Sequence, residues 1–272
     1  MKNLFAFISA LLLFSVLSSC DREDSFLIPE NQDIPLLEKL KHSDTTYKIF
    51  TYTDNNLLFE EKSKFFYQKH VYNKSNQLIR KEWYTDASVY SSSSYVIEEA
   101  QQRTEWVSPD NTERDMYKTY EYNDAGELIT IIMNRENHEP AKTEYSYNLN
   151  GQIEKESHYY QGELSSYSLY TYDNRGNVKK LEKYSIDSNG NEILSTSTEF
   201  DYDDKYNPYR AFSRLCQPGK YTNVNNIIKE TYRIHFDPGP GVDNVQSTEF
   251  TYEYNDSGYP ISQDGLIEFV YK

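Results

Sequence analysis

A tyrosine motif that recurs at a fixed spacing constrains this chain more than any other feature. Residues 120–128, 145–153 and 170–178 read YEYNDAGEL, YSYNLNGQI and YTYDNRGNV, so the first tyrosine returns every 25 residues. Tyrosines two positions apart face the same side of a strand. The Asn or Asp that follows starts a turn, the glycine three residues later suits a positive φ, and the apolar residue begins a return strand. Each unit therefore predicts a β-hairpin.

Weaker copies extend the pattern along the chain. In residues 70–78 (HVYNKSNQL) Asn76 takes the place of the glycine, because asparagine tolerates the left-handed region better than most residues. Further copies are expected at 50–54, 95–97, 200–204, 232–241 and 252–258. Repeats of 20–50 residues indicate an array in which neighbouring units bury each other's faces. We expect an all-β fold, an antiparallel meander of about 14–17 strands. Because open twisted sheets rarely exceed about 10 strands, the meander should curl into a barrel or half-barrel.

The first residues read as a bacterial export signal. Lys2 supplies a positive charge, and the apolar run from Leu4 to Leu17 is shorter than the roughly 20 residues that span a bilayer. The run ends in Leu17-Ser-Ser-Cys20, which is similar to a lipobox, where the signal is cut before the cysteine and that cysteine is acylated. Several acyl chains make a stable membrane anchor. An ordinary secretory signal with an incidental cysteine is the alternative.

Together these motifs carry a resemblance to a known group of proteins. The repeat resembles the YD (RHS-type) repeat, and with the lipobox the chain resembles tyrosine-rich lipoproteins of Bacteroidetes, one family of which has unknown function and a porin-like β fold. Residues 203–208 (DDKYNP) and 267–271 (IEFVY) are similar to that family, and the likeness covers about 47–272. It implies an outer-membrane address. Acidic residues directly after the lipidated cysteine, as in 21–24 (DRED), imply cell-surface display, whereas a solvated tether is the plainer interpretation.

The composition is consistent with a domain whose core is built from tyrosine and which does not bind nucleic acid. The 272 residues include 27 tyrosines, whose rings supply apolar area and whose hydroxyls reach water or a partner. The formal net charge of −15 repels nucleic-acid phosphates, so no nucleic-acid partner is expected. Positions that alternate with the tyrosines, such as Thr119, Glu121, Glu144 and Ser146, are polar, which favours an anchored water-soluble domain over a lipid-facing one.

The chain divides into three parts. Residues 1–19 are the expected signal peptide, 20–46 the lipidated cysteine and its tether, and 47–272 the β domain. Within the tether, residues 33–40 (DIPLLEKL) have leucines at helical spacing and predict a short amphipathic helix. Residues 206–228 interrupt the hairpin rhythm. Insertions in repeat arrays map to one face, which makes this segment either a binding loop or a cap.

No pattern of catalytic or metal-binding residues stands out. If Cys20 is acylated, Cys216 has no partner in the chain and is read as a small buried hydrophobe. No two histidines lie two to four residues apart, as a zinc motif would require, and His70 occupies a tyrosine position and is expected to pack. The acids fall mostly at turn positions, and no EF-hand, phosphate loop or G-x-S-x-G is present. We therefore expect no cofactor, no metal and no enzymatic activity.

Two tryptophans are the candidate ligand residues. Trp83 and Trp106, with exposed tyrosine rings, would make a platform on which a sugar can stack; the plainer interpretation places these rings in the core. The expected function is a cell-envelope lipoprotein with a binding or interaction role, anchored through Cys20 and taking a glycan or protein ligand. The alternative is a hydrolase that acts on glycans with carboxylates at a fixed separation, although no pair stands out among the 43 acids.

Overall fold

The computed structural model describes residues 34–85, 105–236, 239 and 243–272. These residues form one antiparallel sheet of 17 strands. The strands are β1 Leu37–His42, β2 Thr45–Tyr52, β3 Leu58–Ser63, β4 Phe66–Tyr72, β5 Leu78–Thr85, β6 Arg114–Tyr122, β7 Leu128–Arg135, β8 Ala141–Tyr147, β9 Ile153–Tyr160, β10 Glu163–Tyr172, β11 Val178–Ile186, β12 Glu192–Tyr206, β13 Asn225–Ile234, β14 Val245–Glu249, β15 Tyr252–Tyr254, β16 Pro260–Gln263 and β17 Ile267–Tyr271.

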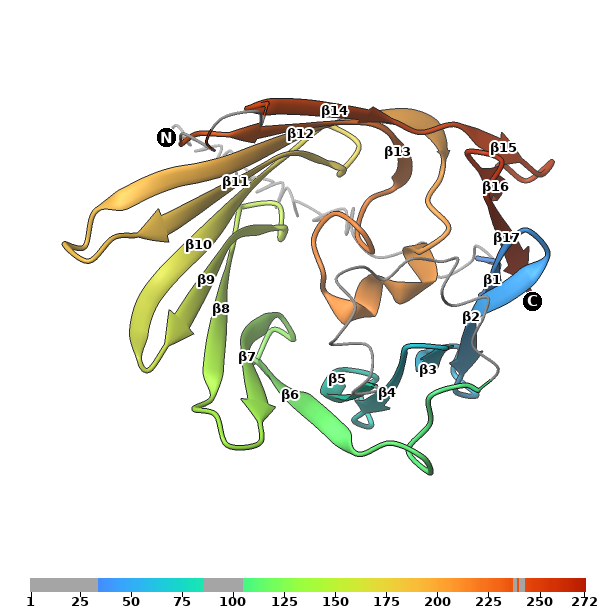
Figure 1. Ribbon diagram of the computed structural model, residues 1–272, viewed down its shortest axis with the longest axis horizontal. Coiled ribbons are helices and arrows are strands. Elements are labelled where there is room, and N and C mark those ends of the chain that lie inside the picture. The colour runs from blue at the N-terminus through green and yellow to red at the C-terminus, as the bar shows by residue number, and fades with distance from the viewer. Residues whose placement is uncertain (1–33, 86–104, 237–238, 240–242) are drawn as a thin grey trace, which may run out of the picture.

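The sheet curls around a central space (Figure 1). Strands β1 to β13 each pair with the next strand in the chain, and β15, β16 and β17 continue the order back to β1. Strand β14 pairs with β13 and β15 pairs with β16, but within the described residues no ladder joins β14 to β15. The predicted all-β meander is therefore confirmed, with the sheet curled but not closed into a barrel.

The turns have the chemistry that the motif predicts. Gly126, Gly151 and Gly176 have φ of 84°, 75° and 89°, and Asn76 takes the same left-handed conformation at 59°. In the first of these turns, the Gly126 amide donates to the Asn123 carbonyl at 2.9 Å, and the pairing register shifts at the adjoining strand end. A type I turn followed by a bulge explains both observations. The predicted copy at 95–97 lies outside the described residues.

The second tyrosine of each motif bonds to the preceding repeat. Its hydroxyl donates to the backbone carbonyl of the apolar residue that opens an earlier return strand, as in Tyr147 to Leu128 at 2.8 Å and Tyr172 to Ile153 at 2.7 Å. The same bond joins Tyr52 to Leu37, Tyr72 to Leu58, Tyr122 to Leu78 and Tyr202 to Val178. The recurrence of tyrosine thus has a second cause besides ring burial: each phenol satisfies a carbonyl of the neighbouring unit.

The expected helix at 33–40 is wrong, and so is the end of the tether at residue 46. Residues Leu37–His42 form β1, which pairs with β2 on one side and with the C-terminal strand β17 on the other. A register shift between Leu37 and Lys39 lets Leu37 and Leu40 both be buried although they are three residues apart. This bulge imitates helical spacing, and the pairing partner lies more than 200 residues away in sequence.

The insertion between β12 and β13 lies inside the curled sheet. We call residues 207–224 the plug; it includes a 3₁₀ helix, η2 (Arg210–Leu215), which Figure 1 shows within the ring of strands. Phe212 is 2% exposed, with its ring centroid 5.1 Å from that of Phe50 and 5.7 Å from that of Tyr221. Together with leucines of β1, β3 and β5 these rings form the main hydrophobic cluster. Of the two roles considered for this insertion, its position fits the cap.

Candidate ligand site in the lumen

A cavity of about 940 Å³ occupies the part of the lumen that the plug leaves open. Its wall comes from strands β5 to β13, and the plug contributes the segment from Leu215 to Tyr221. The first tyrosines of the three clear repeats, Tyr120, Tyr145 and Tyr170, all line it. Period-two alternation predicts that these tyrosines point inward. Where the plug fills the lumen, inward rings form part of the core, and elsewhere they line the cavity.

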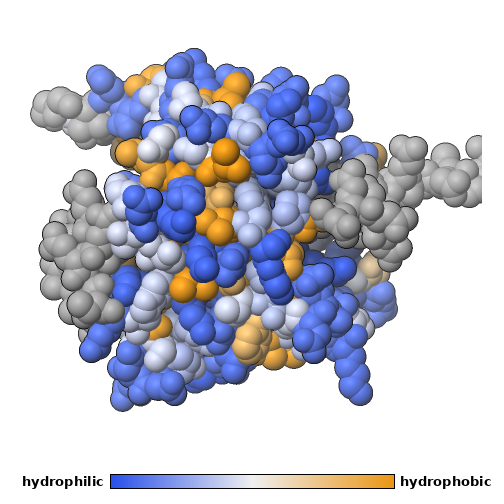
Figure 2. All heavy atoms as spheres, turned by 90° about the vertical axis from the view of Figure 1, so that its right-hand side faces the viewer, coloured by the Kyte–Doolittle hydropathy of each residue, from blue (hydrophilic) through white to orange (hydrophobic). Residues whose placement is uncertain are grey.

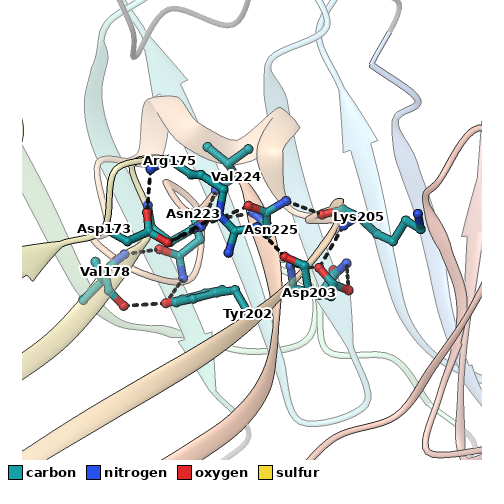
Figure 3. Close-up of polar contacts among 11 residues, drawn as sticks. Asp173, Arg175, Val178, Tyr202, Asp203, Lys205, Asn223, Val224 and Asn225 are labelled. Atoms are coloured by element: carbon teal, nitrogen blue, oxygen red, sulfur yellow. Dashed lines mark hydrogen bonds and ion pairs between the residues drawn. The ribbon is translucent and has the colours of Figure 1, made fainter.

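Buried asparagines fix the plug to the sheet. Asn177, in the turn before β11, is fully buried; its Oδ1 accepts the backbone N–H groups of Val224 and Asn225 at 2.8 and 3.0 Å. Asn223 in turn accepts the amide of Val178 at 2.9 Å and donates to the Tyr202 hydroxyl at 2.9 Å (Figure 3). Because buried backbone donors are costly when unpaired, this network makes the plug an integral part of the fold.

Asp203 holds together the two strands that flank the plug. It takes the turn position of the 200–204 repeat, where the next residues lead into the plug instead of a hairpin turn. Its carboxylate accepts the backbone amide of Lys205 at 3.0 Å (Figure 3). It also accepts the backbone amide of Asn226 at 3.0 Å and the hydroxyl of Tyr254. The carboxylate therefore ties β12, β13 and β15 together, and turn chemistry remains its role.

The carboxylate of Glu156 lies in the cavity wall between Tyr145 and Tyr170. Glu156 accepts the Tyr145 hydroxyl at 3.1 Å and the Tyr170 hydroxyl at 2.7 Å. Burial, and next the charge of Glu156, raise the pKa of both phenols far above their ordinary value. The phenols therefore keep their protons and act as hydrogen-bond donors, so that both carboxylate oxygens are engaged.

Two lysines and a tryptophan form another part of the cavity wall. Lys81 on β5 lies directly across the ladder from Lys118 on β6, and both face inward with Trp83. The Lys81 ammonium is 4.4 Å from the centre of the Trp83 ring and the Lys118 ammonium 5.5 Å from it. Burial lowers the pKa of Lys81 to about 7 although the charge of Glu61 acts to raise it, and burial lowers the pKa of Lys118. Cations desolvated over a ring retain part of their stabilisation through the ring's quadrupole.

The two tryptophans singled out from the sequence are not brought together. Trp83 lines the cavity, whereas Trp106 lies beyond it, with the Lys64 ammonium 4.6 Å from its ring. Of the two predicted platform residues, Trp83 therefore lies in the cavity wall and Trp106 does not. Sequence reasoning missed Lys81, Lys118 and Glu156. Their signal was available: Lys118 precedes Tyr120 by two, and Lys81 precedes Trp83 by two, which puts each on the inward face.

The remaining predicted residues take structural places or lie outside the described part. Cys20 is outside it. Cys216 borders the cavity, and burial raises the pKa of its thiol to about 11, so it is protonated at neutral pH. His70 is fully buried on β4, and burial followed by the charge of Lys81 lowers its pKa to about 3. Among the residues that the structure describes, no three His, Cys, Asp or Glu side chains gather as a metal site would require.

The outer surface of the sheet carries charge pairs. On alternate positions from the lumen, Arg80 pairs with Glu82 at 2.7 Å, Lys142 with Glu144 at 2.7 Å and Lys180 with Glu182 at 2.8 Å. Figure 2, which faces the side of β16, β17, β1 and β2, shows mostly hydrophilic residues with a narrow, interrupted hydrophobic band. No helix within the described ranges has the length and apolar character needed to cross a membrane.

These features define a class: an all-β protein whose single curled sheet encloses a plug and a tyrosine-lined cavity. The structure is similar to a porin-like protein from Bacteroides uniformis, at 12% identity over 87% of this chain and 96% of that one, with a TM-score of 0.43. A porin-like protein from Bacteroides vulgatus matches at 11% identity over 88% and 99% of the two chains, with a TM-score of 0.39.

A second kind of match is to toxin complexes. The chain is similar to part of the structure of the Photorhabdus luminescens Tc holotoxin pore carrying TccC3-D651A, at 15% identity and a TM-score of 0.30. That match covers 77% of this chain but only 10% of the other, so the chain spans a small fraction of the toxin's length. No family model and no curated protein sequence matches the chain.

Proposed function

We propose that this protein is a cell-envelope lipoprotein whose β domain binds a ligand in its lumen without catalysing a reaction on it. The cavity of about 940 Å³ is the observation that carries the proposal. Ligand sites are typically concave, of roughly 300–1,000 Å³, and lined by aromatic groups with a few placed polar groups. Here the aromatic lining consists of tyrosine and tryptophan rings, and the polar groups are Lys81, Lys118 and Glu156.

The fixed plug supports binding over transport through the lumen. Its asparagine contacts and the Phe212 cluster tie it to strands on both sides, so it acts as a floor. The charge pairs on the outer face support a domain that stands in water and is held at the membrane by its anchor. A glycan or a peptide segment fits a site of this kind, and the rings with their hydroxyls favour the glycan.

Filling the cavity should abolish binding. Ser166 faces the lumen on β10, and Ser166→Trp places an indole in the open space. We expect glycan and peptide libraries to yield ligands for the unmodified protein, with binding reduced at least tenfold in the variant. Ser146→Trp on the exposed outer face of β8 is the matched control and should bind like the unmodified protein. A ligand that binds Ser166→Trp undiminished, or libraries that yield no ligand, would contradict a luminal site.

The anchor has its own test at Cys20. Cells fed an alkyne-tagged fatty acid should label the mature protein, and Cys20→Ala should remove the label and release the protein from the membrane fraction. Cys216→Ala, which alters the other cysteine, should leave labelling and membrane association unchanged. Intact-cell protease digestion then distinguishes surface display from a periplasm-facing position. An unlabelled mature protein would refute the anchored address.

The hydrolase alternative has less support. Glycoside hydrolysis needs two carboxyl groups at a defined separation. The described cavity wall contributes one carboxylate, Glu156, which is already bonded to two phenols, together with His158. The acids of the hairpin turns bond to backbone amides instead, as Asp173 does with Arg175 and Asn177. Binding therefore stands ahead of hydrolysis as the proposed role.

A further inference from the structure

The lumen carries excess positive charge in a strongly acidic protein. Lys81 and Lys118 are opposite each other on neighbouring strands, and like charges placed directly opposite destabilise a sheet. The whole chain has a formal charge of −15, so acidic residues were available to pair with them. In a cavity wall rich in tyrosine rings, these two adjacent inward lysines face each other and not an acid across the ladder.

The acids near these lysines are already engaged. Glu61, 5% exposed, pairs with Lys48 at 2.7 Å, and both carboxylate oxygens of Glu156 accept tyrosine hydroxyls. The groups that face Lys81 are Lys48 of β2, Glu61 of β3, His70 of β4, Lys118 of β6 and Lys220 of the plug. His70 is neutral, so cations outnumber carboxylates around Lys81 even when the charge of Glu61 is counted against them. The charge of Glu61 raises the pKa of Lys81 and the charge of Glu156 raises that of Lys118, so each carboxylate offsets part of the positive charge. With both acids counted, the four lysines still outnumber the carboxylates among the described side chains.

We propose that the lumen binds an anionic saccharide, with the acid group of the sugar held between the Lys81 and Lys118 ammonium groups. This inference rests on the proposed function, because it names the ligand class of the same cavity. An anion here would replace the repulsion between the two lysines with two charge-assisted hydrogen bonds. Binding would thereby offset a cost that the unliganded sheet carries.

The rest of the wall suits a sugar rather than an acyl chain. Across from the lysines, strands β10 to β12 present hydroxyl-bearing side chains to the cavity: Ser166, Ser168, Ser185, Ser195 and Thr196. The rings of Tyr120, Tyr145 and Tyr170 line the same cavity. Hydroxyls that donate and accept match a polyol, and ring faces match the C–H face of a pyranose.

The test compares a charged with a neutral oligosaccharide. We expect trigalacturonate to bind the purified protein at least tenfold more tightly than galactotriose when measured by calorimetry at pH 6. Lys81→Met and Lys118→Met should each lower trigalacturonate affinity at least tenfold and leave galactotriose affinity within twofold. Methionine preserves length, and each substitution removes one of two like charges that lie directly opposite each other, so both variants should fold. Thermal melting without ligand checks this.

The matched control is a lysine in the same geometry on the outer face. Lys142 lies 4.5 Å from the Tyr159 ring, close to the 4.4 Å of Lys81 from Trp83. Lys142→Met should leave trigalacturonate binding unchanged. A sulfated chondroitin disaccharide provides a second arm: tighter, lysine-dependent binding of that probe supports the proposal and makes sulfate the preferred acid group.

Protonation adds an independent readout. The pKa of Lys81 is lowered to about 7, so the cationic form that binds the anion is lost as pH rises through 7. Trigalacturonate affinity should fall between pH 6 and 8.5, by up to about tenfold per unit above 7, and Lys81→Met should flatten the profile. Equal affinity for charged and neutral probes, or insensitivity to both lysine substitutions, would overturn the inference. If galactotriose binds more tightly than trigalacturonate and its binding is still lost in Ser166→Trp, the anionic ligand class is refuted and the luminal site stands.

Discussion

Phe212→Ala is expected to lower the free energy of unfolding by about 3–5 kcal/mol, the usual range when a large buried side chain is truncated. The Phe212 ring is 2% exposed and meets the rings of Phe50, Tyr52, Tyr209 and Tyr221 at centroid distances of 5.1 to 6.2 Å. Removing it leaves a void between the plug and strands β1 to β5. The melting temperature should fall by roughly 6–20 °C for a domain of this size.

A surface phenylalanine provides the control for this variant. Phe236 follows β13 and is 54% exposed, so Phe236→Ala should stay within about 0.5 kcal/mol of the unmodified protein. Calorimetry or urea unfolding of the three proteins makes the comparison. Near-equal stability of Phe212→Ala and Phe236→Ala would mean that the plug is not part of the folded core, and the floor of the proposed site would lose its basis.

The second large effect is expected from Asn177→Ala, which removes the asparagine that fastens the plug to β11. The substitution leaves the amides of Val224 and Asn225 without their acceptor in a buried setting. It also removes the Nδ2 donor to Asp173 and to the Asn225 side chain, at 3.0 Å each. Each unsatisfied buried group costs about 1–3 kcal/mol, so we expect a loss of about 3–5 kcal/mol in unfolding free energy.

The chain contains a matched turn for this experiment. Asp187 and Asn191 repeat the Asp173–Asn177 arrangement, with the amide of the later residue and its Nδ2 donating to the aspartate at 2.8 and 2.9 Å. Asn191 is exposed and contacts no plug, so Asn191→Ala should cost less than about 1 kcal/mol. Urea unfolding of both variants separates the turn's contribution from that of plug docking; similar losses would refute the docking role.

The repeat motif anticipated the local structure well because its chemistry is local. Two local effects define each turn: the positive φ of Gly126, Gly151 and Gly176, and the side-chain hydrogen bonds of Asn123 and Asp173. Both act within a few residues, so they can be predicted from the sequence. Period-two alternation likewise sent Tyr120, Tyr145 and Tyr170 to one side. The antiparallel meander follows from short connections, and its curl follows from strand number and twist.

Other features depended on partners that are distant in sequence. Leu37 and Leu40 looked helical because only the pairing of β1 with β17 and the bulge within it make them a strand. Trp83 and Trp106 looked equivalent until the structure placed Trp83 in the cavity wall and Trp106 beside Lys64. The role of residues 206–228 was open between loop and cap until Phe212 was seen packed against Phe50.

By itself, then, the amino-acid sequence determined the hairpin unit, its turn chemistry, the inward side of its tyrosines and the all-β class. The tertiary structure alone decided where β1 belongs, that the insertion folds into the lumen, and that Lys81, Lys118 and Glu156 share one cavity. The physical reason is range. Turn and alternation preferences act between residues a few positions apart. The lumen, the docked plug and the cluster of charges arise only when the sheet curls and brings distant strands together, in the case of β1 and β17 across more than 200 residues.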